Sequence, residues 1–154
     1  MMLQEGTKVE SFTLQDESGK AISLDDFDGK KKVIYFYPRD DTPGCTTEAC
    51  GFRDVYDDFL AKDAVVLGIS GDTPESHTKF RDKFNLPFHL LADVDKKIIK
   101  RFGSWGEKKS GGRTYDGILR TTFVLDEQNV IIKAYPKVKT ETHAAEILEL
   151  LGAK

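Results

Sequence analysis

The chain has 154 residues, of which 39% are hydrophobic and 32% are charged. This composition predicts one compact domain over residues 1–154, with a core large enough to fold without disulfides or metal ions. The charges are mixed in sign and sum to -3, so neither a nucleic-acid-binding surface nor a basic patch for membranes is indicated. No apolar run reaches the roughly 18 residues of a membrane span, and the start has no signal-peptide pattern. We therefore expect a cytoplasmic protein that binds small molecules or other proteins.

The first half of the chain alternates between strand and helix patterns. The run FTLQDESGKAISL, over residues 12–24, has turn residues between two short alternating segments and predicts a small hairpin. Residues 32–38 and 64–70 are β-branched and aromatic runs, typical of strands buried on both faces of a parallel sheet. Between them, apolar residues at helical spacing predict a helix over 45–60.

The second half continues the alternation. In order, the sequence predicts a helix over 72–84, a strand over 88–92, a short helix over 96–102, a glycine-rich surface loop over 103–117, an antiparallel hairpin with strands over 118–126 and 130–135, and a last helix over 141–151. Strands that alternate with helices in this way predict an α/β fold. We expect a central mixed β-sheet flanked by helices, with an N-terminal β-hairpin extension.

The only two cysteines, Cys45 and Cys50, both lie in the run YPRDDTPGCTTEAC behind the predicted strand 32–38. If Thr42 is the N-cap of the following helix, Pro43 occupies its first position and Cys45 lies in its first turn, with its N–H available to the Thr42 hydroxyl. The helix dipole and the free N–H groups of that turn stabilise a thiolate. Cys45 is therefore a candidate nucleophile.

The spacing of the second thiol is also informative. Five residues along an α-helix place the two Cα atoms roughly 8.6 Å apart, whereas a disulfide needs less than about 7 Å. The helix must therefore open before the sulfurs of Cys45 and Cys50 can join. Gly51 weakens this turn by about 1 kcal/mol relative to alanine, which makes local unwinding easier.

Other interpretations compete with nucleophilic catalysis. Free cysteines are often simply buried, and two of them without further context are more often structural. A zinc site is poorly supported because His77, His89 and His143 are scattered without ligand spacing, so each is interpreted as a surface or partly buried residue. The Cys-x-x-Cys motif of dithiol oxidoreductases does not match either. The surrounding sequence has to decide.

The surrounding sequence resembles one family closely. Pro38-x-x-x-Thr42-x-x-Cys45, following VIYFYP, resembles the active-site signature of the peroxiredoxins. The longer run FYPRDDTPGCTTEAC is similar to the bacterioferritin-comigratory-protein branch, also called the Q-type peroxiredoxins. Further matches extend over nearly the whole chain: FTLQDESGKAISL, VVLGIS, FHLLAD, SWGEKK and ILRTTFVLD.

This resemblance implies a thioredoxin-like fold and the reduction of hydroperoxides by protein thiols, with no metal and no other cofactor. It implies that Cys45 is the peroxidatic cysteine, that Cys50 is the resolving one, and that Arg120, within ILRTTFVLD, is the active-site arginine. A sulfenic acid at Cys45 would condense with Cys50 to an intramolecular disulfide. Thioredoxin or a similar dithiol would then restore both thiols. Relatives of this branch are often monomers, and we expect a monomer.

The remaining motif residues make chemical sense in these roles. Thr42, the Cys45 N–H and Arg120 would donate hydrogen bonds to the charge that develops as the O–O bond breaks. Pro38 would help wall the pocket against water. Thr42 and Pro38 also have simpler interpretations, as a helix cap and as a strand terminator, whereas Arg120 within an apolar strand is harder to explain without a partner. Glu48 is equally well interpreted as a first-turn acid favoured by the helix dipole or as a partner that orients Arg120.

Two functions follow as hypotheses from different classes. The first is an atypical two-cysteine thiol peroxidase that reduces hydrogen peroxide and organic hydroperoxides. The alternative is a redox-switched binding or sensor protein, in which the same disulfide alters a partner interface. The lysine-rich stretch GEKKSGGR within 103–117 is most simply a solvated loop, with partner docking as a second interpretation.

Overall fold

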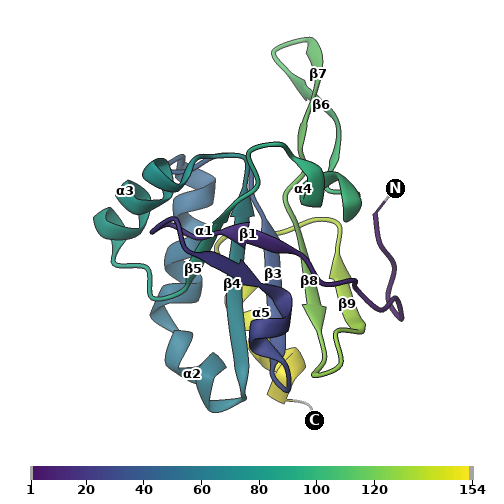
Figure 1. Ribbon diagram of the computed structural model, residues 1–154. Helices are drawn as coiled ribbons and strands as arrows, with labels where there is room; N and C mark the ends of the chain where they lie inside the picture. Colours follow the sequence, from purple (N-terminus) through teal and green to yellow (C-terminus); the bar gives the residue numbers. More distant parts are fainter. Residues whose placement is uncertain (1, 153–154) are drawn as a thin grey trace.

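The computed structural model describes residues 2–152 (Figure 1). Its elements, in chain order, are β1 Thr13–Gln15, β2 Ala21–Ser23, the 3-10 helix η1 Leu24–Phe27, β3 Lys31–Phe36, α1 Pro43–Asp54, α2 Tyr56–Ala61, β4 Ala64–Ser70, α3 Pro74–Phe84, β5 His89–Ala92, α4 Lys97–Arg101, β6 Trp105–Ser110, β7 Arg113–Ile118, β8 Thr121–Leu125, β9 Ile131–Tyr135 and α5 His143–Gly152. Among these residues, no helix combines the length and the apolar character that crossing a bilayer requires.

Seven strands form one mixed sheet in the order β2-β1-β5-β4-β3-β8-β9. The central strands β3, β4 and β5 are parallel, whereas β8 pairs antiparallel with both β3 and β9. The N-terminal hairpin β1–β2 joins the sheet through the pairing of Gln15 with Ala92 in β5. The predicted mixed sheet with an N-terminal hairpin is therefore confirmed.

The sheet has a hydrophobic core on each face because successive side chains of a strand point to opposite sides. Val33 and Tyr35 of β3 pack on the side covered by α1, α2, α3 and α5. Ile34 and Phe36 pack on the other side, under the N-terminal segment, β2, η1 and α4. Strand β3 is thus fixed from both sides, and the chain that leaves its end on the way to α1 starts from a rigid point.

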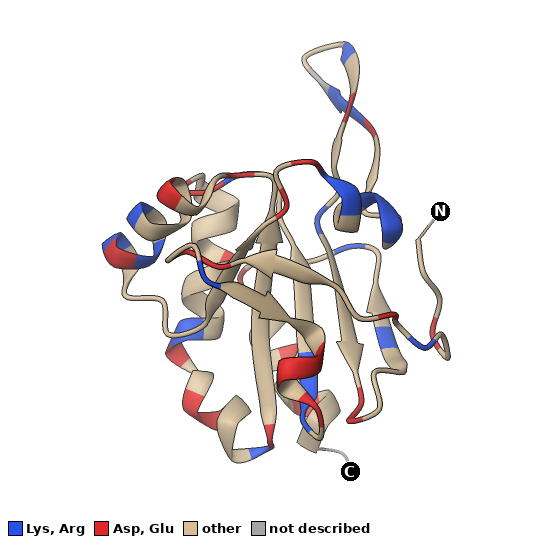
Figure 2. Cartoon of the chain, in the orientation of Figure 1, with Lys and Arg blue, Asp and Glu red and all other residues tan. Residues whose placement is uncertain are grey.

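The segment predicted as a surface loop over 103–117 is instead a second hairpin. Strands β6 and β7 pair antiparallel from Trp105 with Ile118 to Ser110 with Arg113, and the hairpin projects away from the body of the molecule (Figure 1). Gly111 and Gly112 form its tip with φ values of 56° and 79°, which glycine adopts without strain. The strand signal was missed because no core lies beneath this hairpin, so its sequence is polar on both faces; charges of both signs occur along it (Figure 2).

Two other predicted elements are interrupted. The helix predicted over 45–60 breaks at Val55, whose φ of -122° and ψ of 19° separate α1 from α2. The strand predicted over 118–126 is also broken, because β7 ends at Ile118 and β8 begins at Thr121. Leu119 and Arg120 form the junction, so Arg120 lies just outside the strand in which it was predicted. This junction frees the Arg120 side chain from the alternation of a regular strand.

Candidate active site

The start of α1 has the predicted arrangement. Thr42 is the N-cap with extended backbone angles (φ -103°, ψ 156°) and Pro43 is the first helical residue, which places Cys45 in the first turn. The predicted bond between the Thr42 hydroxyl and the Cys45 N–H is wrong, however. The hydroxyl donates instead to the backbone oxygen of Arg39, at 3.0 Å. The loop turns back on itself here, with Asp41 at a φ of 55°, and this brings the Arg39 oxygen within reach.

The Cys45 thiol is almost completely buried, with 1% of the residue exposed. Arg120 Nη2 donates a hydrogen bond to Cys45 Sγ at 3.3 Å. The guanidinium lies close over Gly44: a Cβ there would be 3.2 Å from Arg120 Nη2, so a larger residue would displace the guanidinium slightly. A guanidinium remains charged at any physiological pH, so it holds a positive charge and directed donors against the sulfur. The structure thus brings together two of the predicted site residues that are 75 positions apart in the sequence.

Glu48 binds the other side of the same guanidinium. Arg120 Nη1 donates to Glu48 Oε1 at 2.7 Å, and the Glu48 side chain has no exposed surface. Glu48 lies in the second turn of α1, so the geometry favours orientation of Arg120 over the interpretation as a first-turn acid. Burial raises the pKa of Glu48 to about 7, although the adjacent Arg120 acts in the opposite direction. Within residues 2–152, the second oxygen of Glu48 and the hydroxyl of Tyr35 are buried without a hydrogen-bond partner.

Lys108 of the projecting hairpin also reaches this site, and the sequence analysis did not identify it. Its Nζ donates to the backbone oxygen of Ile118 at 2.9 Å, two residues before Arg120. Partial burial and the charge of Arg120 lower the pKa of Lys108, whereas Cys45 acts in the opposite direction. A second cation is therefore bound two residues before Arg120 in the chain. The motif SWGEKK contained the signal, but a lysine in a polar stretch cannot be told from a solvated one by sequence pattern.

Cys50 lies on the same uninterrupted helix as Cys45, is half-buried, and carries a free thiol, as Cys45 does. Burial raises the pKa of the Cys50 thiol, with the neighbouring Arg53 acting in the opposite direction. Packing does not require a glycine at the following position, because a Cβ on Gly51 would only reach ordinary contact distances, 3.9 Å from Ala144 Cβ and Thr140 O. The glycine therefore mainly lowers the helix propensity beside Cys50.

Pro38 is half-buried in the loop between β3 and α1, and this loop is tied to the rest of the molecule through Asp40. Asp40 Oδ1 accepts a bond from the Tyr37 hydroxyl at 2.6 Å, and Asp40 Oδ2 pairs with His77 Nδ1 at 2.7 Å. The Asp40 N–H donates to Asp72 Oδ2 at 2.8 Å. This buried network joins the loop to α3 and to the end of β4, and sequence reasoning missed it because its members are far apart in the chain.

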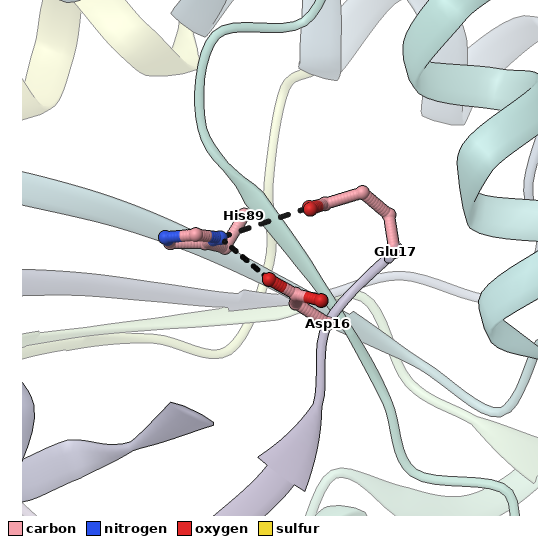
Figure 3. Close-up of side chains that lie close together, drawn as sticks. All are labelled: Asp16, Glu17 and His89. Carbon is pink, nitrogen blue, oxygen red and sulfur yellow. Dashed lines mark ion pairs between the residues drawn. The ribbon is translucent and has the colours of Figure 1, made fainter. Parts of the chain in front are cut away.

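The three histidines do not gather, and two of them are more buried than expected. His77 is completely buried between Asp40 and the Leu91 backbone oxygen, and His143 is buried with its Nε2 2.8 Å from the Thr122 hydroxyl. The third, His89, lies with Asp16 and Glu17, with its Nδ1 3.4 Å from Asp16 Oδ2 and 3.7 Å from Glu17 Oε1 (Figure 3). The surface or partly buried interpretation is thus wrong for His77 and His143, because polar partners inside the fold compensate their burial.

The comparisons with known proteins agree on one family. The AhpC/TSA family profile matches residues 6–134. A putative peroxiredoxin Bcp of Coxiella burnetii is 49% identical over 148 residues, covering 96% of this chain and 98% of that protein.

Two solved structures extend this similarity to the fold. The crystal structure of a cysteine-to-serine mutant of Xylella fastidiosa PrxQ matches with a TM-score of 0.94 and 32% identity, covering 99% of this chain and 98% of the other. A structure of the Xanthomonas campestris bacterioferritin comigratory protein, from work on its alkyl peroxide reduction activity, matches with a TM-score of 0.87 and 36% identity over 92% of this chain and 90% of the other. Together with the thiol and arginine at the start of α1, these similarities show that the chain belongs to the AhpC/TSA family, as a peroxiredoxin of the Bcp or Q-type group.

Proposed function

We propose that this peroxiredoxin reduces hydroperoxides with Cys45 as the peroxidatic cysteine. The observation that carries the proposal is the contact between Cys45 Sγ and the Arg120 guanidinium at the start of α1. In the first step, the Cys45 thiolate attacks one peroxide oxygen, an S–O bond forms and the O–O bond breaks. The departing hydroxide or alkoxide takes a proton and leaves as water or an alcohol, and Cys45 is left as a sulfenic acid.

Arg120 has two functions in this step. Its Nη2 donor meets the thiolate before the reaction, and the same charge can stabilise the oxygen that becomes negative as the O–O bond breaks. Glu48 holds the guanidinium from the opposite side at 2.7 Å, so that little reorganisation is needed at the moment of reaction. Thr42 and Pro38, which lie in the segment that leads from β3 to α1, complete the proposed site. The alkyl peroxide reduction named for the Xanthomonas campestris relative supports organic hydroperoxides as substrates besides hydrogen peroxide.

Cys50 is proposed to resolve the sulfenic acid. Its sulfur attacks Cys45 Sγ, water leaves, and an intramolecular disulfide forms. Because Cα atoms five positions apart on a helix are separated by roughly 8.6 Å, α1 must open first. Burial raises the pKa of Cys50 in the closed helix, so opening also removes the burial that disfavours its thiolate. Thioredoxin or a similar dithiol would then supply two electrons and restore both thiols.

The test compares two cysteine variants. Cys45→Ser should lose all peroxide reduction, whereas Cys50→Ser should retain the first oxidation and lose thioredoxin-linked recycling. Mass spectrometry of the peroxide-treated wild-type protein should show a loss of two hydrogens that joins the two cysteine-containing segments. Undiminished recycling in Cys50→Ser would contradict the role of Cys50, and peroxide reduction in Cys45→Ser would contradict the proposal as a whole. About one turnover per chain would favour the redox-switched binding protein.

A further inference from the structure

The base of the projecting hairpin is built to let one lysine side chain lie across it. Gly106 and Gly117 pair directly across β6 and β7, and residues two positions further along a strand share the same face. The next pair on that face is Lys108 with Tyr115. A Cβ on Gly117 would lie only 3.1 Å from Lys108 Cδ. The Lys108 side chain therefore passes over the bare backbone of Gly117 to reach the Ile118 oxygen.

The bond from Lys108 lies at the start of the segment that carries Arg120. The Ile118 oxygen, which accepts the bond from Lys108 Nζ at 2.9 Å, ends β7. The next N–H, that of Leu119, donates to the Ser104 oxygen at 2.8 Å. On the far side of Arg120, the Thr121 hydroxyl lies 2.7 Å from the Ser104 hydroxyl. Arg120 thus projects from a short junction that is held at both ends, and Lys108 supplies the only one of these contacts that carries a charge.

A purely structural interpretation accounts poorly for this position. A lysine that only stabilised the hairpin could remain in solvent, as Lys109 on the opposite face does. Lys108 is instead half-buried, and its Nζ binds the Ile118 oxygen two residues before Arg120, which already carries a positive charge. Two cations repel each other unless negative charge offsets them. Glu48 already pairs with Arg120 at 2.7 Å, and a thiolate at Cys45, whose sulfur Arg120 Nη2 contacts at 3.3 Å, would add a second negative charge on this side.

We propose that Lys108 is a positioning residue for the reaction at Cys45. Its bond to the Ile118 oxygen fixes where the junction holds Arg120 against the sulfur, and its charge adds to the field that favours the thiolate. The inference rests on the proposed function, in which Cys45 reacts as a thiolate. It also gives the projecting hairpin a role in catalysis.

The experiment measures the reactivity of one thiol. In a Cys50→Ser background, the rate of Cys45 alkylation by iodoacetamide is followed against pH for Lys108→Met, which keeps most of the length of the side chain but lacks its ammonium group. Lys109→Met is the matched control. The other titratable groups that face Cys45, namely Glu48, Arg120 and Tyr35, are the same in both variants. Lys108→Met should shift the alkylation profile to higher pH and slow the single-turnover oxidation by hydrogen peroxide about three- to tenfold, the loss expected for one hydrogen bond of ordinary strength.

Three comparisons keep the result decisive. Lys109→Met should match the parent protein, and Lys108→Arg should restore most of the lost reactivity. Gly117→Ala retains the lysine but crowds its Cδ, so it should shift the profile in the same direction and covers the case that Lys108→Met does not fold. An unchanged profile in Lys108→Met, or equal shifts in the Lys108 and Lys109 variants, would overturn the inference. Alkylation requires no turnover, so this failure is distinct from a failure of the proposed function, which Cys45→Ser reports.

Discussion

Glu48 beside Arg120 and Asp16 beside His89 are both buried carboxylates with a basic partner, yet their pKa values move in opposite directions. Burial raises the pKa of Glu48 to about 7 despite the 2.7 Å pair with Arg120. Burial also acts to raise the pKa of Asp16, but hydrogen bonds from Ser18 and Lys20 outweigh it and lower the pKa. The nearest cation therefore does not decide the outcome.

The difference lies in how many hydrogen bonds each carboxylate accepts. Asp16 Oδ1 accepts bonds from the Ser18 N–H, the Ser18 hydroxyl and the Lys20 N–H. Glu48 Oε2 is buried with no partner among the described residues. A carboxylate that accepts several donors is stabilised as the anion, whereas burial without donors favours the neutral acid. The Asp16 cluster, between β1 and β2, is thus well supplied with hydrogen bonds. The Glu48 cluster, beside Cys45 where the chemistry is proposed, has a buried oxygen without one.

The largest expected effect comes from removing Arg120, the cation of the Glu48 cluster. Arg120→Met should lower the rate of Cys45 oxidation by peroxide about 100-fold, because one donor to the developing charge is lost. It should also reduce the free energy of unfolding by about 3 kcal/mol, because Glu48 remains buried without its partner. Stopped-flow oxidation and urea unfolding followed by the fluorescence of Trp105, the single tryptophan, measure the two effects.

The double variant Arg120→Met/Glu48→Gln separates these effects. It should recover most of the lost stability, since no buried carboxylate is left unpaired, but none of the lost rate. Recovery of the rate together with the stability would show that Arg120 acts only through the fold.

The second effect is a dependence of stability on pH. The pKa of Glu48 is raised from 4.5 to about 7 in the folded chain, so the folded state binds more protons than the unfolded state in that window, and wild-type stability falls as the pH rises through it. Glu48→Gln lacks this loss. Between about pH 5 and about pH 8, it should gain stability relative to wild type by on the order of 2 kcal/mol, measured by urea unfolding at both pH values. If the difference in free energy of unfolding between the two proteins were the same at both pH values, the Glu48 pKa would lie in its ordinary range.

The smallest effect is expected at the Asp16 cluster, and it should change stability alone. Asp16→Ala removes the acceptor of three hydrogen bonds and should reduce the free energy of unfolding by about 1 to 2 kcal/mol without changing the oxidation rate. Because the pKa of Asp16 is lowered on folding, its contribution is present at neutral pH and is lost as the pH falls through the folded pKa. Glu10→Ala, at an exposed position nearby in sequence, is the control, and a slower oxidation in Asp16→Ala would contradict the separation of the two clusters.

Local signals in the sequence predicted those parts of the site that local chemistry determines. Thr42 and Pro43 begin α1 as predicted, and α3 begins in the same way, with Thr73 as its N-cap and Pro74 as its first residue; the Thr73 hydroxyl accepts the Ser76 N–H at 3.2 Å. The family motif placed Arg120 in the site, and the structure brings it to Cys45.

Contacts between distant segments were not predictable in this way. The pairing of Asp40 with His77 and the course of Lys108 over Gly117 depend on which segments the sheet brings together, and no periodicity in the sequence records this. The hairpin β6–β7 was missed for a related reason, since alternation of polar and apolar residues appears only where one face of a strand covers a core.

The packing of Phe52 has a consequence for redox poise. Phe52 is completely buried and stacks on Tyr35, with ring centroids 5.0 Å apart, only two positions beyond Cys50. Opening of α1 that leaves this ring in place disrupts only the turns that carry the two cysteines. The free energy that favours those closed turns must be given up on oxidation, so it favours the dithiol and raises the reduction potential of the proposed disulfide by about 20 mV for each kcal/mol. The stability of the helical turns that carry Cys45 and Cys50 therefore sets how readily an external reductant can return the protein to its dithiol form.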